Sequence, residues 1–244
     1  SCHSRIGSLA EQRLPGSVLH HDLDLMQHPT CAVLDCPDVS AVTATLSVTA
    51  HGADASTGTA QYYDMRSSTA PITEDNWKEA EPVETIPLPQ PGGSSDSVAI
   101  TGLDAGTTYY FALKAKDEVL QISALSNVAQ ATTTKPLLTW ARQRVYWDNW
   151  TDYQNRHLSV DYRMSNPGTG IAIEPGVQAS VCVPVTVYVV TQLPLSLSNL
   201  STGANTSVTL KYFVPATVYS FTTTTHANCK DDAGRLYWSP GPLP

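Results

Sequence analysis

The stretch Thr101-Gly-Leu-Asp-Ala-Gly-Thr-Thr-Tyr-Tyr-Phe-Ala-Leu-Lys-Ala115 decides the fold. A turn rich in Gly and Asp leads into a run of alternating apolar residues, which is the pattern of a half-buried strand. Leu103 lies where a sandwich needs a buried apolar residue to fill its core. Tyr109 lies where a tyrosine corner bonds its hydroxyl to upstream backbone. The stretch therefore predicts an all-β sandwich.

Bulk composition supports this fold class and excludes several functions. The chain has 244 residues, enough for one large or two ordinary domains, and only 15% of them are charged. Recurring Ser, Thr, Val, Gly and Pro favour strands and turns. The net charge is −8 and the 14 basic residues are scattered, which argues against nucleic-acid or anionic-membrane partners. Apolar runs are strand-sized, so we expect no membrane span, and no signal-peptide pattern is visible.

Five cysteines indicate an oxidising compartment, although a buried Cys can also act as a small hydrophobe. Their odd number leaves at least one thiol outside internal pairs. The disulfide candidates are Cys2, Cys31, Cys36, Cys182 and Cys229. If the last two face each other, their bond closes a loop of about 47 residues, worth roughly 3–4 kcal/mol in the chain-entropy model.

Cys31 and Cys36 cannot easily bond to each other in an extended segment. Five residues place their Cα atoms about 16 Å apart, whereas a disulfide needs less than about 7 Å. One of them is therefore expected to point outward, toward an intermolecular partner. A bond from Cys2 to either one is the alternative.

Residues 1–28 differ from the rest and are expected to form an irregular or partly helical arm. His20 and His21 could ligate a metal, but a solvated polar arm is the competing interpretation. Cys2-His3 resembles the cut end of the Cys-x-x-Cys-His motif that attaches haem c in cytochromes, and His20 or His21 would then be a second axial ligand. The leading cysteine of that motif is absent.

Residues 29–134 show the strand spacing of an immunoglobulin-type sandwich. The expected strands are 29–35, 44–50, 60–66, 97–101, 109–115 and 124–131, with an extended segment at 84–89. The region resembles a fibronectin type III domain of bacterial extracellular proteins. The matching segments are Ser56-Thr-Gly-Thr-Ala60, Tyr63-Asp-Met-Arg-Ser-Ser-Thr-Ala-Pro-Ile72, Asn76-Trp77, Gly102–Ala115 and Ser123-Ala-Leu-Ser-Asn-Val128. Val48 stands where that family usually has a core Trp, and no Arg-Gly-Asp tripeptide supports integrin-type adhesion.

A Thr-rich linker at 132–136 precedes a second domain at 135–244. Its expected strands are 144–147, 157–164, 179–190, 206–213 and 218–226. This half is similar to the immunoglobulin-like repeats of bacterial and archaeal surface proteins, in its Asn166-Pro-Gly168 turn and its Val208-Thr-Leu-Lys-Tyr212 strand.

Aromatic residues crowd the start of the second domain: Trp140, Tyr146, Trp147, Trp150 and Tyr153. Trp147 and Trp150 are candidates for stacking on sugar rings or on a neighbouring subunit. A core and domain-interface cluster is the competing interpretation, because Trp is buried on average. Asn149-Trp-Thr151 also reads as a glycosylation sequon, one of three in the chain, although such tripeptides arise by chance.

No catalytic motif is present. The sequence has neither a Gly-x-Ser-x-Gly elbow nor a His-Glu-x-x-His helix, and Asp231-Asp232 lies in a predicted turn. We therefore expect a non-enzymatic extracellular or cell-surface protein that is structural or adhesive. A subunit of a surface or filamentous assembly fits this role, with other protein subunits or cell-surface components as partners. No cofactor is expected. The alternatives are haem-based electron transfer through Cys2-His3 and a carbohydrate-binding module with polysaccharide as partner.

Overall fold

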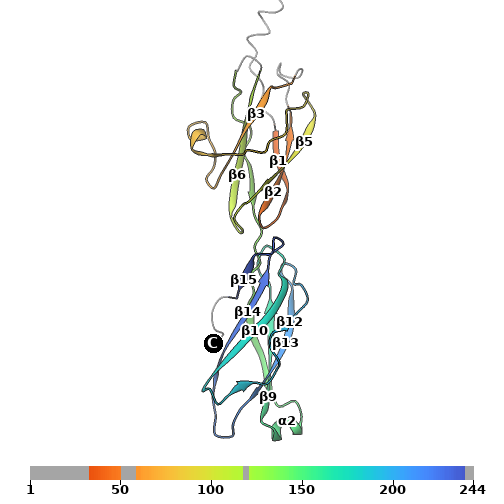
Figure 1. The fold of residues 1–244 in the computed structure, drawn as a ribbon, viewed down its shortest axis with the longest axis vertical. Coiled ribbons are helices and arrows are strands. Elements are labelled where there is room, and N and C mark those ends of the chain that lie inside the picture. Colours follow the sequence, from red (N-terminus) through yellow and green to blue (C-terminus); the bar gives the residue numbers. More distant parts are fainter. Residues whose placement is uncertain (1–32, 51–58, 118–120, 240–244) are drawn as a thin grey trace, which may run out of the picture.

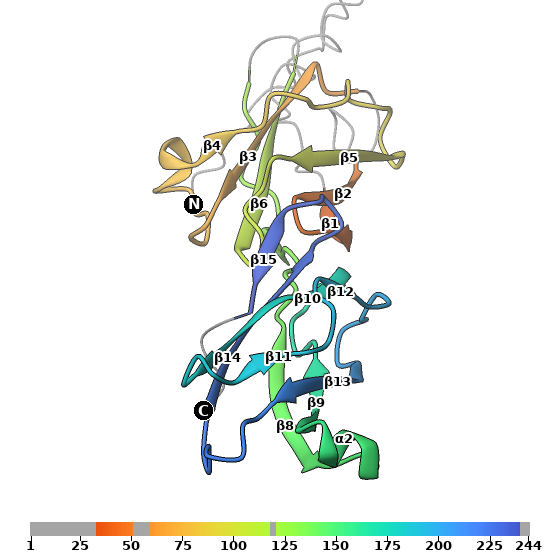
Figure 2. The same ribbon diagram turned by 60° about the horizontal axis from the view of Figure 1, so that its bottom comes forward.

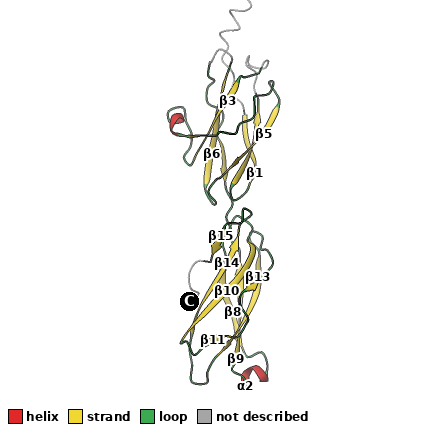
Figure 3. Ribbon diagram, in the orientation of Figure 1, coloured by secondary structure: helices red, strands yellow, loops and turns green. Residues whose placement is uncertain are grey.

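The computed structural model describes residues 33–50, 59–117 and 121–239, and confirms the all-β fold class. Strands dominate, and the helices are single short turns (Figure 3). Two β-sandwiches lie end to end along the long axis (Figure 1). None of the helices in the described part of the chain is long and apolar enough to cross a membrane.

The first sandwich contains seven strands in two sheets. One sheet has the order β1-β2-β5 and the other β4-β3-β6-β7. The strands are β1 (Val33–Val39), β2 (Thr43–Thr49), β3 (Tyr62–Ser68), β4 (Glu81–Pro82), β5 (Ser95–Thr101), β6 (Thr108–Lys116) and β7 (Ala129–Thr132), with a 3₁₀ turn, η1 (Trp77–Glu79). Strand β2 alternates strictly, so Ala44, Leu46 and Val48 enter the core. Phe111 and Leu113 of β6 meet them from the opposite sheet, both fully buried.

The turn before β6 ties the two sheets together. Leu103 is buried, and the amide of Asp104 donates a hydrogen bond of 3.0 Å to the Tyr109 hydroxyl. This is the geometry of a tyrosine corner. Gly106 has φ +69°, a left-handed conformation that a side chain would strain.

The second sandwich has two sheets of four strands each, with orders β11-β13-β9-β8 and β12-β10-β14-β15. Its elements are β8 (Thr139–Tyr146), α2 (Trp150–Gln154), β9 (His157–Ser165), β10 (Ile173–Val183), β11 (Tyr188–Val189), β12 (Leu195–Ser196), β13 (Asn205–Phe213), β14 (Thr222–Lys230) and β15 (Leu236–Trp238). Met164, Leu210 and Tyr212 are fully buried between the sheets. Their strands, β9 and β13, pair over nine residues without a bulge.

Several strands differ from the predicted ranges. The long strand expected at 179–190 begins earlier, at Ile173, and ends at Val183, because Pro184 has no N–H to continue the ladder. The strand expected at 218–226 is Thr222–Lys230, and that expected at 124–131 is reduced to Ala129–Thr132.

The linker between the sandwiches is held on both sides. The amide of Thr134 donates to Ser40 O of the first sandwich, and the carbonyl of Lys135 accepts from the amides of Thr169 and Gly170 in the second. A Cβ on Gly168 would lie 2.5 Å from Lys135 O, so only glycine allows this approach. The linker predicted from composition is therefore an ordered joint.

The turn at Asp231-Asp232 completes the joint. The Asp231 carboxylate is buried and accepts hydrogen bonds from the amides of Ala233 and Arg235. Asp232 accepts from the amide of Ala41, and Arg235 donates to Leu103 O, both at 3.2 Å. This acidic pair therefore organises a turn and contacts the first sandwich.

The expected Cys182–Cys229 disulfide is not formed, and that prediction was wrong. Both thiols are buried and free, and so is the half-buried thiol of Cys36. Cys182 pairs in register with Thr223, six residues along β14 from Cys229, a separation of about 20 Å at the usual rise of a strand. The two cysteines lie on neighbouring strands of one sheet, where they act as small hydrophobic residues. Cys2 and Cys31 lie outside the described residues.

Candidate functional site

The tip of the second sandwich, farthest from the first, carries the short helix α2 between β8 and β9 (Figures 1 and 2). Asn149 begins this helix as its N-cap, because its side-chain oxygen accepts the amide hydrogen of Asp152 at 2.8 Å. Arg156, with φ +61°, follows its end and leads into β9. The helix is thus a compact cap on the tip.

Three rings and one guanidinium gather there, and we name this set the aromatic platform: Trp147, Trp150, Tyr153 and Arg156. Trp150 stacks on Tyr153 with ring centroids 5.2 Å apart and an interplanar angle of 25°. Trp147 meets Tyr153 edge-on at 5.5 Å, and the Arg156 guanidinium lies 5.1 Å from the Trp147 ring centroid. Trp150 is 69% exposed and Tyr153 42% exposed. Exposed rings gathered in one patch, rather than scattered singly, mark a candidate interaction surface.

A buried carboxylate anchors the platform to the sheet. Asp152 is 8% exposed. It accepts hydrogen bonds from Lys211 Nζ of β13 at 2.8 Å and from Asn149 Nδ2 at 3.0 Å. The hydrogen bond to Asp152 is the main cause that raises the pKa of Lys211 above its ordinary value, with Asp148 at 3.6 Å contributing. His157 Nδ1 lies 3.8 Å from the other carboxylate oxygen. These contacts fix the orientation of α2 before any ligand arrives.

The chemistry available at the tip is stacking and hydrogen bonding. A flat ring stacked on a second ring presents one rigid apolar face at little conformational cost. Arg156 and the nearby carboxylates add polar groups at its border. Among the described residues, no group of three or more His, Cys, Asp or Glu side chains is arranged to hold a metal ion.

The structure separates the predicted aromatic cluster into two parts. Trp147, Trp150 and Tyr153 form the platform, whereas Trp140 packs edge-on against Tyr162 in the core, with centroids 6.0 Å apart. The cluster does not lie at the domain interface, because β8 carries the chain from the joint to the opposite end. Both polar atoms of the Asn149 side chain form hydrogen bonds with Asp152: Nδ2 donates to the carboxylate, and Oδ1 accepts from the backbone amide as a helix cap.

Other predicted site residues lie elsewhere. Cys2, His3, His20, His21 and Cys31 are outside the described residues. Leu103 and Tyr109 support the first sandwich. Sequence reasoning missed Arg156 and the helix itself, although Asn-Trp-Thr-Asp at 149–152 has the Asn that favours an N-cap and an acid in the first turn.

Comparison with known proteins supplies limited further information. No protein-family model matches this chain. The chain is 34% identical over 92 aligned residues to Chitinase D of Niallia circulans. This alignment covers 34% of the present chain and 18% of Chitinase D. Among solved structures, chitinase ChiA74 from Bacillus thuringiensis aligns over 82% of this chain and 29% of its own length, with 12% identity and a TM-score of 0.30; this score supports no inference. The chain thus resembles a small part of one chitinase in sequence and is an all-β tandem of sandwiches.

Proposed function

We propose that this chain is a non-catalytic, extracellular accessory segment that binds an insoluble polysaccharide through the aromatic platform. The observation that carries the proposal is the exposed Trp150 ring stacked on Tyr153 at the tip of the molecule. The partial similarity to a protein named as a chitinase makes chitin the first polysaccharide to test. The first sandwich, held by the ordered joint, acts as a spacer.

The contribution of Trp150 to the free energy of binding can be estimated from the area of the ring face that a ligand would cover. A Trp side chain buries about 150–250 Å² when fully covered, so one ring face accounts for about 75 Å². At about 25 cal/mol per Å² this stabilises the complex by about 2 kcal/mol, which corresponds to about 30-fold in the dissociation constant. Ordering the ligand offsets part of this gain, so we expect a loss of about 10- to 30-fold without the ring.

Adsorption to suspended chitin tests the proposal, with cellulose as the comparison polymer. Trp150→Ala should weaken adsorption, while Trp238→Ala should leave it unchanged. Trp238 is a matched control because it is 55% exposed and lies in β15, near the joint. Equal adsorption of Trp150→Ala and the unaltered protein would refute the platform as the binding surface.

A subunit role in a surface or filamentous assembly is the second candidate. Strand β8 is the outer strand of its sheet, and most of its side chains are exposed. Its free edge can accept a strand from a neighbouring molecule. Light scattering over a hundredfold range of concentration tests this role, and a constant monomer mass would contradict it. Haem-based electron transfer through Cys2-His3 rests on residues outside the described part, and a visible spectrum without a Soret band would contradict it.

A further inference from the structure

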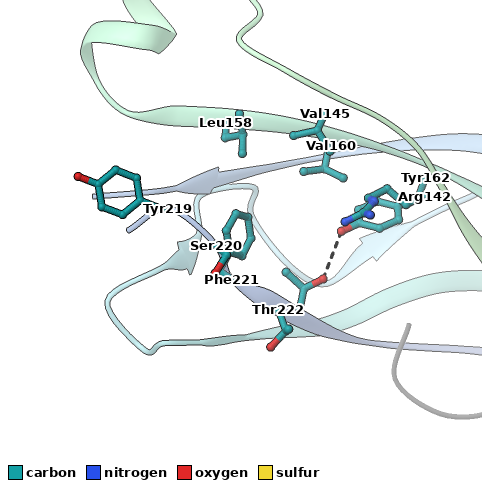
Figure 4. A pocket seen from close by; sticks show the side chains of 10 residues that line it. Arg142, Val145, Leu158, Val160, Tyr162, Tyr219, Ser220, Phe221 and Thr222 are labelled. Atoms are coloured by element: carbon teal, nitrogen blue, oxygen red, sulfur yellow. Dashed lines mark hydrogen bonds between the residues drawn. The ribbon is translucent and has the colours of Figure 1, made fainter. Parts of the chain in front are cut away.

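A hollow lies on the side of the second sandwich, where no strand of the described residues closes the gap between its two sheets. It has a volume of about 410 Å³ (Figure 4), which is in the range of sites for small molecules. One wall comes from β8 and β9 and the other from the segment that enters β14. Its lining residues are Arg142, Val145, Leu158, Val160, Tyr162, Tyr219, Ser220, Phe221, Thr222 and Thr223.

The topology explains why this hollow is open. Strand β8 ends one sheet, and in the other sheet β15 pairs with β14 only through Asn228–Lys230. Within the described residues, no strand pairs with the β15 side of β14 at Thr222–Thr225. Leu158, an inward-facing residue of β9, is therefore only half-buried at this gap, and the buried Val160 lies beside it in the lining of the hollow. An apolar floor that faces water favours an apolar ligand.

One end of the hollow is polar. Arg142 pairs in register with Tyr162, so their side chains lie on the same side of neighbouring strands (Figure 4). The Tyr162 hydroxyl also lies 3.4 Å from Thr223 Oγ1 and 3.2 Å from the Tyr212 hydroxyl. The hydroxyls of Tyr162 and Thr223, which line the hollow, can donate to and accept from a ligand oxygen, and Tyr212 supports Tyr162 from the core.

The charge at this end is not balanced by any carboxylate of the described residues. Within the described part of the chain, no carboxylate lies within 4.0 Å of the Arg142 guanidinium, whereas Arg144, two residues on, pairs with Asp161 at 3.1 Å. The bulge between Arg142 and Arg144 places the second arginine on its own carboxylate and leaves the first at the hollow. A guanidinium beside an apolar wall suits a carboxylate or sulfonate that carries an apolar body.

We infer that this hollow binds an amphipathic anion, an aliphatic or aromatic carboxylate or sulfonate. Its apolar body lies over Leu158, Val160 and Phe221, and its acidic group reaches Arg142 with the Tyr162 hydroxyl beside it. The site is distinct from the aromatic platform, which lies at the tip on α2, and does not depend on polysaccharide binding.

The test uses decanoate, the neutral decanol, and the fluorescent probe 1-anilinonaphthalene-8-sulfonate on the full chain. Saturable probe fluorescence that decanoate displaces more strongly than decanol is expected. Arg142→Gln should weaken decanoate binding about 10-fold, as expected for one partly exposed charge-assisted hydrogen bond, and leave decanol unchanged. Val145→Phe, which fills the hollow at a half-exposed position, should weaken both.

Arg163→Gln is the matched control. Arg163 belongs to β9, pairs with Ala141, and is exposed on the other face of the same sheet. The Arg163→Gln substitution removes the same charge as Arg142→Gln and should leave decanoate binding unchanged. Equal weakening by the two arginine variants, equal binding of decanoate and decanol, or the absence of saturable binding would each overturn the inference.

Discussion

Asn166 provides the sharpest test of how the second sandwich is held together. Its side chain is fully buried and makes four hydrogen bonds to backbone. Nδ2 donates to Gly170 O at 2.8 Å and to Leu200 O at 2.9 Å, and Oδ1 accepts from the amides of Leu137 at 3.1 Å and Gly168 at 3.2 Å. One amide therefore connects the joint, the turn after β9 and the segment before β13.

The effect of Asn166→Ala follows from these contacts. Each buried hydrogen bond contributes about 1 kcal/mol, and its loss leaves a backbone group without a partner. Four of them amount to about 4 kcal/mol. For a sandwich of about 100 residues this loss lowers Tm by about 20 °C. Asn166→Asp keeps the two acceptor bonds but places a buried carboxylate oxygen against Gly170 O and Leu200 O, so at pH 7 it should destabilise at least as much as the alanine variant.

Differential scanning calorimetry measures this effect. The first sandwich is an internal reference, because its unfolding transition should move little while that of the second falls. Asn205→Ala, at an exposed position of β13, is the matched control and should change Tm by less than about 2 °C. If Asn166→Ala lowers the free energy of unfolding of the second sandwich by less than about 1.5 kcal/mol, the reasoning is refuted.

Two further predictions concern charge. Hydrogen bonds from Thr209, then Arg144 and Tyr146, lower the pKa of Asp161 below its ordinary value. The folded state then binds fewer protons than the unfolded state, so this stabilisation is present above the ordinary carboxyl pKa and is lost as pH falls through the lowered one. Urea midpoints between about pH 6 and 2 should therefore fall less steeply in Asp161→Asn, and identical slopes would contradict this. Asp152→Ala should release the platform and weaken adsorption to chitin with altered near-UV dichroism; unchanged dichroism would contradict the anchoring role.

Local patterns in the sequence were sufficient for the fold class. Alternation in β2 and β6, and the Gly-rich turn before Tyr109, depend only on neighbours along the chain, and the structure forms strands at both places. Strand ends were less predictable. The loss of pairing beyond Val183 follows from Pro184, whereas the early start of β10 at Ile173 depends on β14, its partner across the sheet.

The candidate site was predictable only in part. The crowding of Trp147 and Trp150 is visible in the sequence, but the same residues suit a buried interface equally well. Their exposure follows from the direction of β8, which leads away from the joint. The anchoring of α2 by Lys211, 59 residues after Asp152, has no local signal, because the contact joins separate elements of the sheet.

The sequence by itself determined the all-β class and the tyrosine corner, because each rests on alternation or turn chemistry within a few residues. Tertiary structure alone decided which cysteines can meet, how the joint is held, and which side chains stay open to solvent. Those outcomes depend on strand order and register. Cys182 and Cys229 point into one core yet cannot bond. Among the described residues, Arg142 has no carboxylate partner, whereas Arg144, two residues on, pairs with Asp161.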